Sequence, residues 1–194
     1  MGSKLDFKNL RNKHHQFYLA IYPETDADLN GYHCGGGLDL GLNEAGVEEA
    51  RKLARRFKKN PLKIRKIYAS SELRTIQMAD ILHDEMKGRI ILAREFLDQV
   101  LGDLEGRPMD LKQSSSMKVS SPVRGENDEA FSLRVRQGLE RIFQEEDLVL
   151  LATHPRVARQ VLEWLGLGNE NFLRCTLYAI DLPLGQGIAH YREV

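Results

Sequence analysis

Short apolar runs alternate along the chain with longer stretches in which apolar residues recur every three or four positions. A short apolar run bounded by polar residues predicts a buried strand, and the three-to-four spacing predicts a helix with one apolar face. Strands are predicted over 16–22, 63–70, 89–93, 147–153, 176–182 and 187–194, and helices over 44–59, 70–88, 128–145 and 156–167. This alternation favours an α/β layered fold with a largely parallel sheet.

Local signals mark the ends of several helices. Asn43 is a good N-cap for the helix over 44–59, and Asn60-Pro61 ends that helix. A serine is predicted as the N-cap of the helix over 70–88. The inward positions of three helices are Val47, Ala50, Ala54 and Phe57, then Ile76, Ala79, Leu82 and Met86, then Phe131, Val135, Leu139 and Ile142. Each set lies on one helix face, so these helices are expected to pack on the sheet.

Composition is that of an ordinary globular chain, with 194 residues of which 42% are apolar and 29% charged. One domain over 1–194 is expected, with 1–15 as an N-terminal extension that lacks the apolar core of a secretion signal. Formal net charge is zero, so no overall field attracts nucleic acid or a membrane surface. A serine-rich stretch between 93 and 127 predicts a mobile surface loop.

The cysteines, the histidines and the length of the apolar runs bear on the compartment, on metal binding and on membrane association. Cys34 and Cys175 lie far apart and form no CxxC motif, which indicates a cytoplasmic protein with two free thiols. No HExxH or cysteine-rich spacing is present, so no metal site is expected. The longest apolar run is far shorter than the ~20 residues that span a membrane, so no membrane association is expected.

Candidate functional residues follow the ends of predicted parallel strands. Arg74 lies in the first turn of the helix after the second strand, and His154 lies where the strand over 147–153 meets its helix. Tyr22 ends the first strand. The carboxyl ends of parallel strands share one edge, and helix N-termini there favour anions. Arginine and histidine at that edge therefore predict a phosphate site, although each residue alone is more typical of a structural role.

Five segments in order resemble the histidine phosphatase superfamily, also called the phosphoglycerate mutase-like family, over roughly 16–167. The segments are LNEAGVEEARKLA, IYASSELRTIQMA, EFLDQVLGDLEGRP, RGENDEAFSLRV and VLLATHPRVARQVL. The resemblance implies a three-layer α/β/α sandwich that needs no cofactor. It implies that Arg74 is a phosphate-binding arginine, that Asp98 takes the place of the family's acid, and that His154 is its second active-site histidine.

The family's signature, Arg-His-Gly-Glu-Thr, ends the first strand, and this chain has Ile21, Tyr22, Pro23, Glu24 and Thr25 there. In the family the histidine attacks phosphorus and the arginine neutralises phosphoryl oxygens. A tyrosine hydroxyl has a pKa near 10 and stays protonated without an activator. The isoleucine removes a charge, and one lost electrostatic donor commonly costs about 2.7–4 kcal/mol. Proline also removes an N–H group.

Several roles for the surviving residues stay open at this point. Tyr22 is a candidate replacement nucleophile, and His33 in the glycine-rich loop is another. With them, Asp98 and His154 complete the catalytic candidates, and Arg74, His154 and Thr25 are the phosphate-binding candidates. The alternative is that Arg74, Asp98 and His154 form a polar network that only holds the strand ends together.

We therefore expect a catalytically impaired phosphatase-like protein that binds a phosphorylated small molecule, a phosphoprotein or another protein partner. An active phosphomonoester hydrolase with an altered nucleophile is the first alternative. A polyanion- or nucleic-acid-binding module is the second, because residues 51–66 hold nine basic residues and no acidic one. Such a run is more often the solvated face of a helix. Ligand specificity would depend on the loops over 26–42 and 100–127.

Overall fold

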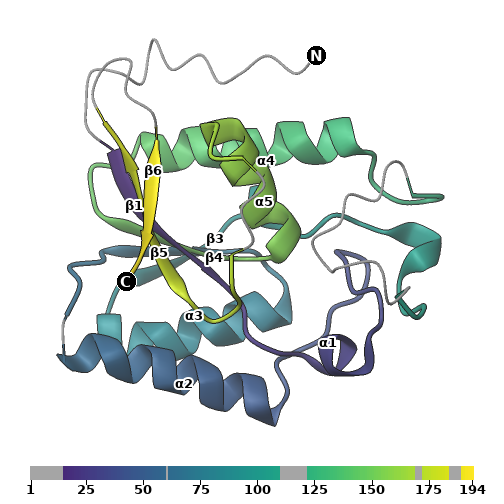
Figure 1. The fold of residues 1–194 in the computed structure, drawn as a ribbon, viewed down its shortest axis with the longest axis horizontal. Coiled ribbons are helices and arrows are strands. Elements are labelled where there is room, and N and C mark those ends of the chain that lie inside the picture. Colours follow the sequence, from purple (N-terminus) through teal and green to yellow (C-terminus); the bar gives the residue numbers. More distant parts are fainter. Residues whose placement is uncertain (1–14, 60, 110–121, 169–171, 184–188) are drawn as a thin grey trace.

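The computed structural model describes residues 15–59, 61–109, 122–168, 172–183 and 189–194 (Figure 1). The predicted N-terminal extension up to residue 14 and the predicted serine-rich loop lie outside the described residues. Both predictions therefore stay predictions.

Six strands form one sheet in the order β3-β2-β4-β1-β5-β6. They are β1 (His15–Ile21), β2 (Lys66–Ala69), β3 (Arg89–Leu92), β4 (Val149–Thr153), β5 (Leu177–Leu182) and β6 (His190–Glu193). Strands β3, β2, β4 and β1 run parallel, while β5 and β6 join as antiparallel neighbours. The mostly parallel sheet confirms the α/β class expected from the alternation of strands and helices.

Helices cover both faces of this sheet, as Figure 1 shows. On one face lie α2 (Glu44–Lys59) and α3 (Leu73–Met86), and on the other lie α4 (Asp128–Phe143) and α5 (Pro155–Leu165). The loops after β1 and β3 carry the short helix α1 (Asp26–Asn30) and the 3-10 helices η1 (Arg94–Phe96) and η2 (Gly102–Leu104). The three-layer α/β/α sandwich is confirmed.

Strand β1 contributes side chains to both halves of the core, because its side chains alternate between the two faces of the sheet. One cluster, with α4 and α5, takes Phe17, Leu19 and Ile21, and the other, with α2 and α3, takes Tyr18, Ala20 and Tyr22. Tyr22 thus continues the alternation one residue beyond the strand. Its ring points to the α2–α3 side, and the neighbouring Ile21 points to the opposite side.

The predicted inward faces of the helices are largely confirmed. Buried positions include Ala50, Ala54, Phe57, Ala79, Leu82, Phe131, Val135, Leu139 and Ile142, whereas Val47, Ile76 and Met86 are half-buried. The prediction of a serine N-cap on α3 is wrong. The N-cap is Glu72, whose side chain makes no capping hydrogen bond. Its carboxylate instead turns into the interior, where it has other partners.

The basic run over 51–66 lies mainly on α2, as a solvated helix face. Basic residues Arg51, Lys52, Arg55, Arg56 and Lys58 are exposed, while Leu53, Ala54 and Phe57 between them are buried. Arg55 also forms a surface ion pair with Glu48 at 2.6 Å. Among the described helices, none combines the length and the apolar character needed to cross a membrane.

The residues just after Tyr22 are held against the start of α2. Glu24 accepts a hydrogen bond from Asn43 Nδ2 at 2.9 Å through its side chain and one from Asn43 N at 3.3 Å through its carbonyl. Asn43 also caps α2, because its Oδ1 accepts from Gly46 N at 2.8 Å. A Cβ atom at Gly46 would lie 2.2 Å from the Glu24 carbonyl oxygen. Glycine is therefore required for this close approach.

We expect Gly46→Ala to destabilise the protein by about 1–3 kcal/mol, because neither backbone segment can give way to the added methyl group. The direction of the stability change is informative, because replacing glycine with alanine at an unconstrained helix position stabilises a helix by roughly 0.5–1 kcal/mol. Urea denaturation measures the change, with Glu49→Ala on the exposed face of α2 as a control expected within about 0.5 kcal/mol of wild type. A Gly46→Ala protein as stable as wild type would contradict this packing.

Candidate active site

Three neighbouring parallel strands bring candidate residues to one edge of the sheet. Strand β1 ends just before Tyr22, β2 just before Ser70, and β4 just before His154. Tyr22 N–H donates to Thr153 O at 3.0 Å, which extends the β1–β4 ladder to the site itself. Tyr22 is 2% exposed, and Ser70 and His154 are fully buried. The predicted convergence of Tyr22 and His154 at this edge is thus present in the structure.

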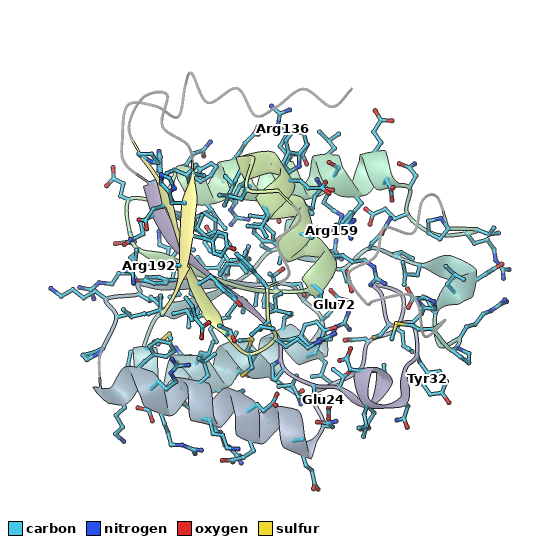
Figure 2. All side chains as sticks on the ribbon, viewed as in Figure 1. Glu24, Tyr32, Glu72, Arg136, Arg159 and Arg192 are labelled. Carbon is cyan, nitrogen blue, oxygen red and sulfur yellow. The ribbon has the colours of Figure 1, made fainter. Side chains whose placement is uncertain are left out.

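Glu72 is the central anion of the site. Its Oε1 accepts from Arg74 Nη2 at 2.7 Å, and its Oε2 lies 2.8 Å from His154 Nε2. Oε2 also accepts from the Asp98 backbone N–H at 2.8 Å and from Ser70 Oγ at 3.1 Å. Glu72 is only 4% exposed. One internal carboxylate therefore binds both residues that the sequence predicted for phosphate, Arg74 and His154 (Figure 2 shows Glu72 in the interior near the start of α5).

The Arg74 guanidinium is surrounded by protein acceptors. Besides Glu72, it donates from Nη1 to Leu38 O at 3.2 Å, from Nη2 to Gly35 O at 3.2 Å, and from Nε to His154 Nδ1 at 3.3 Å. Arg74 is fully buried. Leu38 and Gly35 belong to the glycine-rich segment after α1, so this loop covers Arg74 with its own carbonyl oxygens.

The contacts of His154 define its protonation pattern. Nδ1 accepts from Arg74 Nε, so the ring proton lies on Nε2, which faces Glu72 and Ser70. Ser70 Oγ lies 2.8 Å from Nε2 and 2.7 Å from Thr75 Oγ1. His154 therefore donates to Glu72 through Nε2 and accepts from Arg74 through Nδ1.

Asp98 lies on the other side of Arg74 and is fully buried. Its Oδ2 is 3.7 Å from Arg74 Nη2, 3.8 Å from His154 Nδ1, and 3.4 Å from Arg156 Nη1. Arg156 Nη1 also donates to Cys34 O at 3.3 Å. The structure thus brings Asp98 to Arg74 and His154, as the resemblance implied, and adds Arg156 as a further cation.

Tyr22 is enclosed by charged and aromatic groups. The guanidinium carbons of Arg74 and Arg174 lie 5.2 and 4.6 Å from the centre of its ring, within the range of cation–π contacts. The His154 ring lies edge-on with its centre 5.3 Å away. Arg174 forms an ion pair with Asp28 of α1. Each of the two arginines beside Tyr22 therefore has its own carboxylate partner.

The ionisation of Tyr22 and Glu72 follows from these surroundings. Burial raises the pKa of the Tyr22 phenol above its ordinary value of 10.0, and the charges of Arg174 and Arg74 oppose this only in part. Burial alone would raise the pKa of Glu72, but His154, Arg74 and the Asp98 N–H outweigh it and lower the value to about 2. At neutral pH the site therefore holds a protonated phenol and an ionised internal carboxylate.

The two cysteine thiols are no better prepared for attack than the Tyr22 phenol, whereas His33 keeps a neutral ring. Cys34 and Cys175 are both free thiols, and burial raises the pKa of Cys34 to about 11 and that of Cys175 to about 12. His33 is buried in the covering loop, and its Nδ1 has no hydrogen-bond partner. Burial and the charge of Arg156 lower the pKa of His33, which keeps its ring neutral.

Thr25 has a local role in the structure. Its Oγ1 donates to Asp28 Oδ2 at 2.7 Å and accepts from Asp28 N at 3.4 Å, which makes it the N-cap of α1 in a capping box. This position orients Asp28 toward Arg174. The hydroxyl predicted for phosphate is thus engaged in positioning the loop beside Tyr22.

Sequence reasoning missed four members of this network. Glu72 reads as an ordinary acidic residue near a helix start, and Arg156 and Arg174 read as surface charges. Ser70 falls at the predicted start of the helix over 70–88, where a serine is expected only as a cap. No local pattern distinguishes Glu72 from a solvated acid, because its partners His154 and Asp98 N lie far away in the sequence.

Comparison with known proteins agrees with this geometry. The family model described as histidine phosphatase superfamily (branch 1) matches residues 18–182. The chain belongs to the histidine phosphatase superfamily. That assignment confirms the family inferred from the five sequence segments.

Relatives extend the likeness to phosphoglycerate mutase-like proteins. Phosphoglycerate mutase-like protein 4 of Arabidopsis thaliana is 30% identical over 142 residues, which are 66% of this chain and 61% of that protein. The chain therefore spans about three fifths of the length of this relative. A phosphoglycerate mutase from Bacillus anthracis superposes with a TM-score of 0.79 at 19% identity, covering 96% of this chain and 95% of that one.

A second solved structure shares the fold. A putative alpha-ribazole-5'-P phosphatase from Escherichia coli superposes with a TM-score of 0.75 at 20% identity, covering 92% of this chain and 95% of that one. At such identities the superpositions show the fold and leave the chemistry to be argued from the residues present.

The depressed pKa of Glu72 predicts a defined pH dependence of stability. A carboxylate whose folded pKa is about 2 instead of 4.5 stabilises the folded state above pH 4.5, and this contribution is lost as the pH falls toward 2. Glu72→Gln should therefore lower the free energy of unfolding at neutral pH by on the order of 3 kcal/mol.

Urea denaturation at a series of pH values checks this prediction, and the difference between wild type and Glu72→Gln should shrink between pH 4.5 and 2. Glu49→Gln, an exposed carboxylate on α2, is the control and should stay within about 0.5 kcal/mol of wild type. A difference that does not depend on pH would show that the charge of Glu72 is not what stabilises the fold.

Proposed function

We propose that this chain is a catalytically impaired member of the histidine phosphatase superfamily, and that it acts by binding and not by hydrolysis. The observation that carries the proposal is the environment of Tyr22. A buried phenol, with its pKa raised, stands where the superfamily has a nucleophilic histidine. A neutral imidazole offers a lone pair at neutral pH, whereas this phenol stays protonated.

The loss of charge at Ile21 supports the same conclusion. The signature arginine would be replaced by an apolar side chain that packs on the α4–α5 side of the sheet. Phosphoryl transfer depends mainly on positioning and on electrostatic stabilisation of the transferred group. The remaining cations are already engaged, since Arg74 bonds Glu72 and Arg174 pairs with Asp28. Little uncompensated positive charge is left for a transferring phosphoryl group.

A binding role has two versions, a phosphorylated ligand and a protein partner, and both use the carboxyl edge of the sheet. The ligand version rests on Arg74 and His154. The partner version gains support from exposed apolar side chains on segments at that edge, among them Leu29, Tyr32 and Leu173. Tyr32 lies at the periphery and points outward in Figure 2. Nucleic-acid binding through 51–66 has weaker support, because that run is the solvated face of α2.

We expect no turnover above background when the purified chain is assayed with aryl phosphates and with a panel of phosphate monoesters. The reason is that the Tyr22 phenol stays protonated, together with the loss of a charged donor, which alone is worth about 2.7–4 kcal/mol of transition-state stabilisation. His154→Ala, expressed and purified in parallel, gives the background that a contaminating phosphatase would produce.

Turnover that disappears in His154→Ala would overturn the proposal in favour of an active hydrolase with an altered nucleophile. Tyr22→Phe and His33→Ala would then identify the attacking group, because each removes one candidate and leaves the other. Loss of activity in Tyr22→Phe alone would assign attack to the phenol.

A further inference from the structure

Four donor groups surround the carboxylate of Glu72, namely Arg74, His154, Ser70 Oγ and Asp98 N, and we call this set the anion seat. Glu72 lies in the seat as a bound ligand would. The two carboxylate oxygens receive hydrogen bonds from all four of these groups, at 2.7–3.1 Å. The donors come from different segments of the chain, namely the β2–α3 turn, the first turn of α3, the segment after η1 and the end of β4.

Donors that converge on two carboxylate oxygens are suited to other oxyanions. Arginine binds carboxylate and phosphate through the same planar array of N–H groups, and a backbone N–H or a hydroxyl donates a hydrogen bond to either anion. A residue that only paired with Arg74 would not need three further donors on its second oxygen. The contacts of Glu72 therefore correspond to those of an oxyanion held in a prepared site.

Charge balance opposes a second anion at the seat. Buried charges are stable only when they are paired, and each cation around Tyr22 already has a carboxylate partner. Arg74 is paired with Glu72, Arg156 with Asp98, and Arg174 with Asp28. A phosphate dianion added to this neutral set would meet Glu72 and Asp98 at close range.

We propose that Glu72 is an internal anion that occupies the seat and excludes phosphate, so that Glu72 is the specificity-determining residue of this site. The inference rests on the proposed function, because it takes Arg74 and His154 as the phosphate-binding part of an impaired site. Wild-type protein then has no measurable affinity for inorganic phosphate or phosphate monoesters at the seat.

The test is anion rescue of Glu72→Ala, which empties the seat but leaves all four donors. This variant leaves Arg74 and His154 without their shared partner, so it is expected to melt well below wild type in chloride buffer. Inorganic phosphate should raise its melting temperature by roughly 5–10 °C once the phosphate concentration is about 100 times the dissociation constant. Wild type should show only the small, general shift that phosphate gives any protein.

Two controls separate seat binding from that general effect. Glu145→Ala removes another partly buried carboxylate, the partner of Lys66 and Tyr68 at the opposite edge of the sheet, and phosphate should not restore its stability specifically. The double variant Glu72→Ala/Arg74→Met removes the main cation of the seat, and its rescue by phosphate should be lost.

If Glu72→Ala does not fold in chloride buffer, the yield of refolding with and without phosphate becomes the measurement, and the inference requires phosphate to increase it. Wild-type binding is measured separately by phosphorus NMR titration. Phosphate binding to wild type that is lost in Arg74→Met would overturn the inference. Rescue of Glu72→Ala by acetate but not by phosphate would also overturn it, because the seat would then fit only a carboxylate.

The outcomes for the two proposals are distinguishable. If phosphate does not stabilise Glu72→Ala, Glu72 is not an internal anion. The lack of turnover would still support an impaired enzyme in that case. Phosphoester turnover by wild type would overturn the proposed function itself, whatever the rescue experiment gave.

Discussion

A single buried carboxylate, Glu72, holds the functional edge of this protein together. It joins the start of α3 through Arg74, the β4–α5 junction through His154, and the segment after η1 through the Asp98 N–H. Arg74 in turn binds the carbonyl oxygens of the glycine-rich loop. Because a buried charge without partners is very costly, these segments have to stay in register around Glu72. That requirement keeps the glycine-rich loop and the segment after η1 packed against Arg74 and Glu72.

Two changes that look separate in the sequence act on the same chemistry. In the proposed function, Tyr22 stands in place of the attacking histidine and Ile21 in place of a charged donor to the phosphoryl group. Glu72 occupies the place of the anion that would be attacked. The side chains of Tyr22 and Glu72 meet around Arg74, whose guanidinium lies beside the Tyr22 ring and bonds Glu72. Under the proposed function, a scaffold that retains Arg74 and His154 keeps a well-ordered site without keeping the reaction, because the same polar groups stabilise the fold.

Much of this architecture was predictable from local patterns. The period of the apolar residues identified the strands and helices, and parallel topology places residues after β1, β2 and β4 at one edge. That was enough to bring Tyr22, Arg74 and His154 together. Glu72 and Arg156 were not predictable, since a charged residue near a helix start is usually solvated. Whether such a side chain turns inward depends on partners that are far away in the sequence.

The family, the order of the elements and the loss of the signature histidine can be inferred from the amino-acid sequence alone, because each depends on residue identity at a known spacing. What the remaining polar groups bind depends on the folded chain. Hydrogen bonds between Glu72, His154 and the Asp98 backbone join positions 26 to 82 residues apart, and only the folded sheet brings them within 2.8 Å. Thr25, which the family signature suggested for phosphate, is a helix cap that positions Asp28.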